Sequence, residues 1–278
     1  MDDVKKYDPE DLKKLQKILL SMLKDILKIC DENDIKVFAV CGTGIGAARH
    51  NGFIPWDDDL DLGFLRKDFD KFVEVCKTDL PDKYELITME NTEDYFIHFS
   101  KIVLKGTRFD EWWADQVSFT QGIFVDLFVM ENLPDSKIKQ FYYTKFGRVI
   151  RKLIPISILK PNNLNQPMKS VILAIHYFFK IFHINPAFLK RRFLKMVTRY
   201  NDTETNYVYD ITGFKFTYVY ERHLLDNIIK VPFEDTEIGL PENYIDFLSV
   251  EYKNPMEMPP VEKRFNHVEA DIDFGPYE

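Results

Sequence analysis

Cysteine is scarce in this sequence, which holds three cysteines in 278 residues. Cys30, Cys41 and Cys76 lie far apart and form no CxxC pair, so we predict neither a zinc ribbon nor a disulfide framework. Each is expected to pack as a small apolar side chain. Free cysteines are typical of a reducing compartment, and a cytoplasmic location is therefore expected.

Long apolar runs are also missing. The beginning of the sequence is charged and has no early apolar region of the kind found in signal peptides, so secretion is not predicted. The best candidate for a membrane span, residues 171–188, is interrupted by histidine, lysine, asparagine and proline. A transmembrane helix is therefore not expected.

Acidic residues are absent from one long segment. Residues 136–201 contain nine lysines, five arginines and no Asp or Glu, although the formal net charge of the chain is −8. The acidic balance of the whole chain argues against nucleic-acid binding, which needs clustered basic residues. Basic residues interleaved with apolar ones favour peripheral association with an anionic membrane, at the inner face of the cytoplasmic membrane. The alternative is a helical subdomain with a solvated basic face against the acidic remainder.

Apolar residues make up 45% of the chain, which is enough for a sizeable core. Their periodicity predicts helices over 9–30, 45–50 and 67–76, and strands over 36–41, 60–64, 84–89, 96–104 and 122–130. Two or more helices, separated near Pro161 and Pro186, are expected in the basic segment. This order predicts an α/β (α+β) fold with a small mixed sheet, flanking helices and a helical, basic subdomain.

Two aspartates two residues apart form the sharpest local signal. On a strand, Asp59 and Asp61 would project from one face and their apolar neighbours from the other. Carboxylates that close repel each other unless a cation lies between them, and Mg²⁺, or Mn²⁺, takes oxygen ligands while leaving positions for phosphate. The pair therefore predicts a metal clamp for phosphoryl chemistry. An exposed acidic turn is the ordinary alternative.

Two further elements strengthen the metal hypothesis. Gly42 and Thr43 follow a strand and precede a helix, where backbone N–H groups bind phosphate well. Asp126 stands inside the apolar strand 122–130, where an ionised carboxylate is costly unless it is paired, ligates a metal or faces a cleft. A Gly-Thr turn, two paired acids and a later acid together match the three-part nucleotidyltransferase pattern, with Asp59, Asp61 and Asp126 as catalytic metal ligands.

The stretch GTGIGAARHNGFIPWDDDLD at residues 42–61 closely resembles the signature of the LicD family of phosphotransferases, which includes the fukutin group. GIFVDLF at 122–128 is similar to the second block of that family, and Lys101 and Thr107 resemble the pair between the blocks. MPPVEKRFNH at 258–267 resembles its C-terminal block. The usual YGDYM before that block is replaced by YKNPM at 252–256, a change that bears on substrate identity.

The resemblance implies metal-dependent transfer of a phospho-alcohol, phosphocholine first of all, from a CDP-activated donor. The acceptor would be a hydroxyl of a lipid-linked or cell-surface glycan, such as lipopolysaccharide, capsule or a teichoic acid precursor, and CMP would leave. Three parts are expected: a nucleotidyltransferase-like catalytic core at 1–134, a basic helical insertion at 135–201 that faces the membrane or acceptor, and a C-terminal part at 202–278 that completes the catalytic domain.

The resemblance also suggests which side chains bind the substrate, each with a structural alternative. Arg49 and Lys101 would pair with donor phosphates, although Arg49 would equally suit an ion pair with a neighbouring aspartate. His50 would carry a proton or serve only structurally. Trp56 would stack on cytosine or choline, or orient the acidic loop by packing. The further candidates are Arg264 and His267, which would close over the site, and Trp112, Trp113 and Tyr95, which would form a choline cage.

Three readings of function stay open from the sequence. The same fold would also suit a true nucleotidyltransferase that releases pyrophosphate, or a non-catalytic scaffold with a decayed site. Retention of three costly acids argues against decay. Choline, glycerol and ribitol phosphates all remain open as the transferred group, as do the acceptor sugar, the number of metals and the oligomeric state.

Overall fold

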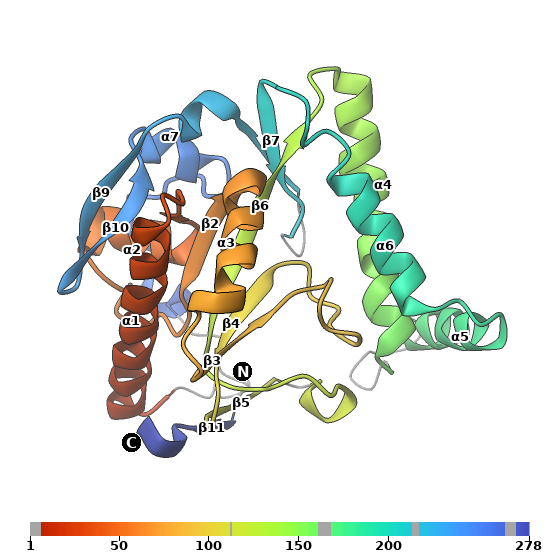
Figure 1. Cartoon of the computed structure of the whole chain (residues 1–278), viewed down its shortest axis with the longest axis horizontal. Coiled ribbons are helices and arrows are strands. Elements are labelled where there is room, and N and C mark those ends of the chain that lie inside the picture. The colour runs from red at the N-terminus through yellow and green to blue at the C-terminus, as the bar shows by residue number, and fades with distance from the viewer. Residues whose placement is uncertain (1–6, 112, 161–167, 213–216, 265–270, 278) are drawn as a thin grey trace.

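The computed structural model describes residues 7–111, 113–160, 168–212, 217–264 and 271–277 (Figure 1). Within these residues, seven strands form one mixed sheet, and five of them lie in the order β1-β2-β6-β4-β3. Their bounds are β1 Phe38–Ala39, β2 Asp61–Leu65, β6 Phe124–Leu133, β4 Ser100–Leu104 and β3 Tyr84–Ile87. The long strand β6 runs parallel to β2 and antiparallel to β4.

The sheet continues beyond the far end of β6. Strand β7 (Tyr207–Asp210) pairs with Glu131 to Leu133 of β6, and β8 (Tyr218–Glu221) pairs with β7. Two smaller antiparallel pairs lie outside it: β9 (Ile228–Phe233) with β10 (Thr236–Pro241), and β5 (Arg108–Asp110) with β11 (Asp271–Asp273). The expected α/β (α+β) class is confirmed. The division into three parts stays a prediction.

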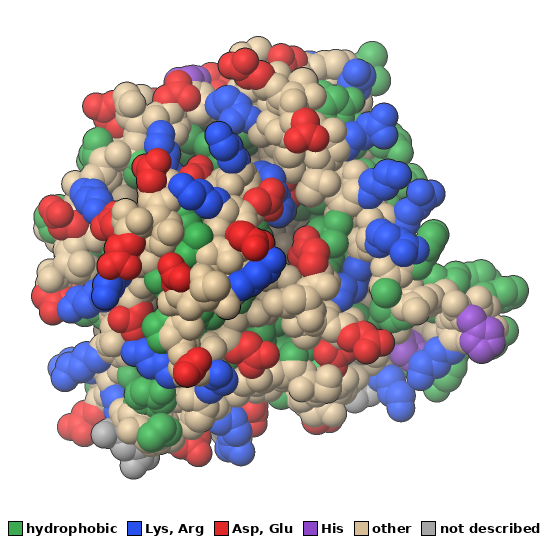
Figure 2. All heavy atoms as spheres, viewed as in Figure 1, with side chains coloured by type: hydrophobic (Ala, Val, Ile, Leu, Met, Phe, Trp, Pro, Cys, Tyr) green, Lys and Arg blue, Asp and Glu red, His purple; other side chains and the backbone are tan. Residues whose placement is uncertain are grey.

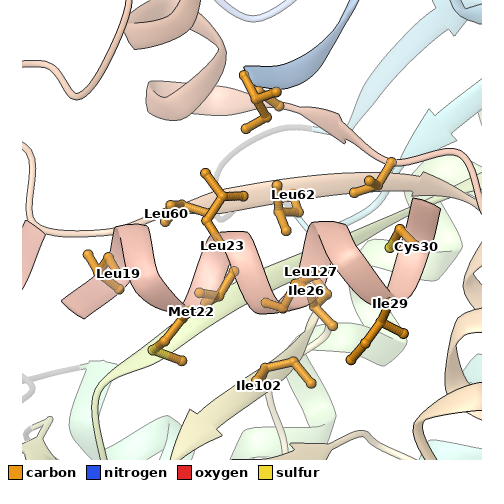
Figure 3. Close-up of a cluster of buried hydrophobic side chains, with 14 of the residues drawn as sticks. Leu19, Met22, Leu23, Ile26, Ile29, Cys30, Leu60, Leu62, Ile102 and Leu127 are labelled. Atoms are coloured by element: carbon orange, nitrogen blue, oxygen red, sulfur yellow. The ribbon is translucent and has the colours of Figure 1, made fainter. Parts of the chain in front are cut away.

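Helix α1 (Pro9–Glu32) covers one face of the sheet and builds the main core (Figure 3). Its apolar stripe, which includes Leu19, Leu23 and Ile26, packs on Leu60, just before β2, and on Leu62 within β2. Leu127 of β6 and Ile102 of β4 continue the same layer. Because side chains alternate along a strand, the residues between these ones point to the opposite face. That opposite face carries the acids.

Three helices follow β6 and form a separate arm at the side of the sheet (Figure 1). They are α4 (Lys137–Ile158), α5 (Met168–Ile181) and α6 (Pro186–Val197). The remaining helices are α2 (Cys41–His50), α3 (Arg66–Asp79) and α7 (Tyr244–Ser249), with short 3-10 turns at Ala114–Gln116, Arg222–Leu225, Val261–Lys263 and Gly275–Tyr277. No single described helix is long and apolar enough to cross a membrane, although α5 and α6, bent by 103°, would pass such a test together.

Two expected element boundaries are corrected by the structure. Helix α2 begins at Cys41 rather than at residue 45, because Gly44 N–H already donates to Val40 C=O at 2.8 Å. Gly42 and Thr43 therefore lie in the first helical turn and not in a turn before it. Strand β4 begins at Ser100 rather than at residue 96, since its pairing with β6 starts opposite Leu127.

Candidate active site

Three charged side chains from neighbouring strands form a row across the sheet. Asp61 of β2 lies opposite Asp126 of β6, and Lys101 of β4 lies opposite Asp126 on its other side. By strand alternation all three project from the face that α1 does not cover. All three are buried, with exposed fractions of 5%, 7% and 4%. The structure thus brings together two of the three predicted metal ligands and one predicted phosphate ligand.

The electrostatics of Asp61 show that this row holds a surplus of negative charge. Burial raises the pKa of Asp61 well above its usual range, and repulsion from Asp59, Asp126 and Asp57 raises it further. A carboxyl in this position binds a proton unless another cation is present. A divalent cation would replace that proton, so the carboxylates at Asp59, Asp61 and Asp126 fit a metal.

Asp59 itself lies just before β2, in an acidic loop with Asp57 and Asp58. One carboxylate oxygen of each lies within 4.8 Å of the others, a spacing that also suits a cation. The side-chain amide of Gln16, on α1, donates to Asp57 C=O at 2.9 Å and so ties the loop to the first helix. Asp59 therefore belongs both to this loop and to the surroundings of Asp61, and Asp57 and Asp58 extend the site beyond the residues predicted from the sequence.

Thr43 holds Asp61 in place. Its hydroxyl oxygen accepts the backbone N–H of Asp61 at 2.8 Å, and its side chain is buried. Thr43 therefore contacts a predicted metal ligand rather than standing alone in a phosphate loop. Its predicted part in substrate binding stays a prediction.

Gly42 leaves room for the acidic loop. A Cβ atom on Gly42 would lie 2.8 Å from Oδ2 of Asp57, so any larger residue would push that carboxylate aside. The first helical turn of α2, whose N–H groups have no partner within the helix, therefore starts next to the acids. This proximity agrees with, but does not test, the expectation that Gly42 allows close approach to a phosphate.

Lys101 is a buried cation inside the site. Its Nζ lies 3.3 Å from Glu111 and 3.7 Å from Asp126, and it stands 3.2 Å from the ring centroid of Phe124. A lysine held in this way balances part of the negative charge of Asp126. Binding of donor phosphate by Lys101 stays a prediction.

Arg49 and His50, at the end of α2, contact each other and the C-terminal segment. The guanidinium of Arg49 donates to the carbonyl oxygens of Pro255 at 3.2 Å and Glu257 at 2.8 Å, and its Nε–H donates to His50 Nε2 at 3.1 Å. Burial, followed by the charge of Arg49, lowers the pKa of His50. In this arrangement Arg49 fastens the segment at 255–257 to the end of α2.

Trp56 lies at the start of the acidic loop and its ring is covered by Arg264, whose guanidinium carbon is 5.1 Å from the ring centroid. Arg264 also donates to Pro259 C=O at 2.9 Å. Arg264 therefore reaches Trp56 from the C-terminal segment. Its closure over the site and its part in substrate binding stay predictions. Base or choline stacking on Trp56 stays a prediction, and His267 lies outside the described residues.

The expected choline cage is not supported by the positions of its rings. Tyr95 and Trp113 are buried, with exposed fractions of 0% and 5%, and both pack against Phe119. The Tyr95 hydroxyl donates to Phe99 C=O at 2.7 Å. These residues belong to the core because their apolar rings fill the space beside β4, and Trp112 lies outside the described residues.

Two acids near the site were missed by the sequence reasoning. Glu111 pairs with Lys101, and Glu251 accepts a hydrogen bond from the Tyr220 hydroxyl. Burial raises the pKa of Glu251 to about 7, and the charge of Asp210 adds to the effect. Neither acid stands in a repeated or apolar pattern, so their sequence surroundings carry no signal. Asp57, by contrast, belongs to the same acidic run as Asp59.

Residues 34–161, which contain the three acids and Lys101, match the family described as LicD/FKTN/FKRP, nucleotidyltransferase domain. The chain carries a LicD family domain. Over 260 residues the chain is 24% identical to the lipopolysaccharide cholinephosphotransferase LicD of Haemophilus influenzae. The matched region covers 92% of this chain and 95% of that protein. The resemblance seen in the sequence, and the prediction of a LicD-type transferase, are therefore confirmed.

Two uncharacterised proteins match a shorter part of the chain. One, from Rickettsia prowazekii, is 42% identical over 67 residues, which is 24% of either chain. The other, from Rickettsia typhi, is 39% identical over 72 residues, which is 26% of this chain and 23% of that protein. Both matches are local.

Proposed function

We propose that this protein transfers phosphocholine from a CDP-activated donor to a hydroxyl of a cell-surface glycan, with lipopolysaccharide or its lipid-linked precursor as the first acceptor to test. One observation carries the proposal: nearly the whole chain is similar to a lipopolysaccharide cholinephosphotransferase. The row formed by Asp61, Asp126 and Lys101 supports it, since buried carboxylates beside a lysine suit phosphate chemistry.

The metal in this proposal is Mg²⁺, with Mn²⁺ as the alternative, held by Asp59, Asp61 and Asp126. The raised pKa of Asp61, caused first by burial and then by its acidic neighbours, supports a site built for a cation. When bound, the metal would neutralise charge on the diphosphate of the donor. The chain itself orients Asp61 through Thr43 and places Lys101 beside Asp126.

The bonds made and broken define the reaction. The acceptor hydroxyl oxygen forms a bond to the phosphorus that carries choline, and the bond from that phosphorus to the oxygen bridging the two phosphates breaks. CMP leaves with the bridging oxygen. The hydroxyl proton goes to a carboxylate, for which Asp126 is the proposed acceptor if it does not serve as a metal ligand.

A second candidate function keeps the site and changes the leaving group. A nucleotidyltransferase would attach the nucleotide to its acceptor and release pyrophosphate. The family description, a nucleotidyltransferase domain, is what favours this alternative. Transfer of glycerol phosphate or ribitol phosphate from the corresponding CDP-alcohol would use the same bonds as phosphocholine transfer, as would a teichoic acid or capsule acceptor.

The test measures CMP release with Mg²⁺ from CDP-choline, CDP-glycerol and CDP-ribitol, each with and without a lipid-linked glycan extract. We expect CDP-choline with acceptor to give the fastest release, and Asp59→Asn and Asp61→Asn to lower it by at least about a hundredfold. Asp82→Asn changes an exposed aspartate far from the acids in sequence and is the matched control.

Each outcome of this experiment has a meaning. CMP from a different CDP-alcohol would keep the reaction and replace the donor. Pyrophosphate from a nucleoside triphosphate, without CMP from any donor, would establish nucleotidyl transfer instead. Equal rates of CMP release for the Asp61→Asn and Asp82→Asn variants would show that Asp61 takes no part in the reaction.

A further inference from the structure

Helix α4 has two apolar faces on opposite sides. At about 100° per residue, its buried residues fall in one arc: Gln140, Tyr143, Gly147, Arg151 and Ile154. Its exposed large apolar residues fall in an arc centred on the opposite side: Ile138, Phe141, Tyr142, Phe146 and Val149. One packed face is enough to hold a helix on a domain, so the second face has another use.

Helix α5 repeats this arrangement. His176 and Phe179 are buried, whereas Val171, Phe178 and Ile181 are exposed and point away from them. Phe182, just after the helix, packs against Phe178 in a tilted arrangement at a centroid distance of 4.4 Å and is 63% exposed. Of the seventeen large apolar side chains that are exposed among the described residues, twelve lie in this arm and five elsewhere. The concentration distinguishes the arm from the rest of the surface.

The charge of the arm selects the partner. No acidic residue occurs at 136–201, and the basic side chains of Lys145 and Lys152 are exposed on the same side of α4 as its exposed apolar residues. Figure 2 shows apolar and basic side chains gathered along one margin of the molecule, from α4 to the projecting α5. A surface that is both apolar and exclusively basic is complementary to a bilayer with anionic headgroups.

The arm also reaches the level of the site. Helix α4 spans 22 residues, about 33 Å at 1.5 Å per residue, and runs back from the end of β6 beside α6 (Figure 1). Near its end, Arg151 C=O lies 3.1 Å from His98 Nε2, and Lys160 N–H donates to Gln116 at 2.8 Å. His98 stands three residues before Lys101, so the C-terminal part of α4 lies beside the segment that leads into β4, the strand of Lys101.

We propose that the outer face of α4 and α5, here called the membrane face, inserts its aromatic side chains into an anionic membrane interface. Its central residues are Tyr142, Phe146, Val149, Phe178, Ile181 and Phe182. The inference rests on the proposed function in one respect, because it identifies the side from which a lipid-linked acceptor reaches the acids. Binding itself requires neither donor nor acceptor.

Co-sedimentation of the full chain with phosphatidylcholine vesicles, with and without phosphatidylglycerol, tests the proposal. We expect binding to the anionic vesicles only, weakened by salt. Phe178→Ser with Phe182→Ser, and separately Lys145→Gln with Lys152→Gln, should each weaken it at least about tenfold. Matched controls replace exposed residues elsewhere: Ile229→Ser with Ile245→Ser, and Lys13→Gln with Lys17→Gln.

Three results would overturn the proposal. The chain stays in the supernatant with both kinds of vesicle, or the variants and their controls bind equally, or the Phe178/Phe182 variant abolishes a lipid-free dimer seen in sedimentation velocity. The last result would show that this face is a dimer interface between two copies of the chain. Vesicle binding is measured without donor or acceptor, and CMP release is measured with CDP-choline and the glycan extract but without vesicles, so loss of one function is distinguishable from loss of the other.

Discussion

At the scale of single residues, Thr43 links the first helical turn of α2 to the backbone of Asp61, the first residue of β2. Thr43→Val keeps the shape but removes the acceptor of the buried Asp61 N–H. An unsatisfied buried N–H costs about 1–3 kcal/mol, and Asp61 is expected to shift with it. We therefore expect lower thermal stability together with at least about tenfold slower CMP release.

The conservative variant separates the hydrogen bond from side-chain shape. Thr43→Ser keeps the hydroxyl and should retain most of the activity, although it loses a buried methyl group. A Thr43→Val variant that is as fast and as stable as the unchanged protein would contradict the role assigned to Thr43. Thermal unfolding and CMP release, measured on the same preparations, decide between these outcomes.

Glu251 makes stability depend on pH. Its folded-state pKa is about 7, raised by burial, whereas an unfolded glutamate titrates at about 4.3. The folded chain thus holds this proton more tightly, and the associated stability is fully present at low pH and is lost as pH rises through about 7. The glutamine of Glu251→Gln cannot ionise. Between about pH 5 and about pH 8 the free energy of unfolding of this variant should therefore fall less than that of the unchanged chain, by up to roughly 3 kcal/mol.

The glutamine variant preserves the local geometry, because its amide oxygen can still accept the Tyr220 hydroxyl. Glu237→Gln, at an exposed position, is the control and should show the same pH dependence as the unchanged chain. Chemical denaturation at several pH values measures the effect. Parallel pH profiles for Glu251→Gln and the unchanged protein would show that Glu251 is ionised in the folded state.

At the scale of elements, a buried ion pair fixes α3 to the sheet. Arg66, the first residue of α3, donates to both carboxylate oxygens of Glu131 on β6, and Asn201 donates to the same carboxylate. Arg66→Ala leaves Glu131 buried without its cation, so we expect a loss of about 3–5 kcal/mol in the free energy of unfolding. Urea unfolding measures this loss.

The loss should be smaller when both charges are removed. Arg66→Met combined with Glu131→Met replaces the pair by apolar groups, and it should recover part of the stability lost in Arg66→Ala. Lys77→Ala, which breaks an exposed pair with Glu74, is the surface control and should change stability by less than about 1 kcal/mol. Equal effects of Arg66→Ala and Lys77→Ala would contradict a structural role for the buried pair.

Long apolar elements were predictable from the sequence, and short or polar ones were not. The stripe of α1 and the apolar core of β6 showed their periodicity directly, so both were found with small errors at their ends. Strand β7 was not predicted because it follows the basic segment and is only four residues long. Pairing of β2 with β6 depends on contacts between residues more than sixty positions apart, which local patterns do not encode.

The same distinction holds for the site. The motif at residues 42–61 identified Asp59 and Asp61, and the apolar surroundings of Asp126 made its burial foreseeable. The contact between Thr43 and Asp61, and the position of Lys101 opposite Asp126, depend on strand register. Arg49 shows the limit most clearly, because its partners are backbone carbonyls some two hundred residues away.

At the scale of the whole molecule, metal binding should stabilise the fold. The acids come from a loop and two strands that meet only in the folded chain, so a cation bound there favours the native state. Saturation at about a hundred times Kd adds about 2.7 kcal/mol, and Mg²⁺ or Mn²⁺ is therefore expected to raise Tm. Chelation with EDTA should reverse the rise.

The acid variants connect this effect to the site. Asp61→Asn should reduce the increase in Tm caused by Mg²⁺, whereas Asp82→Asn should leave it unchanged. Asp61→Asn should also raise Tm at neutral pH in the absence of metal, because an asparagine, unlike a carboxyl whose pKa is raised by burial, takes up no proton on folding. An increase that is equal in both variants would mean that the cation binds elsewhere on this acidic chain.

Strand β6 carries Asp126 near its beginning. Only three residues separate the end of β6 from the first turn of α4. With the membrane face resting on a bilayer, the distance from the lipid surface to the acids becomes a fixed height. Among chemically equivalent hydroxyls along a glycan, the protein would then modify those at one distance from the lipid that anchors the glycan. The position of phosphocholine along the sugar chain would thus be set by the dimensions of the enzyme as well as by recognition of the sugar.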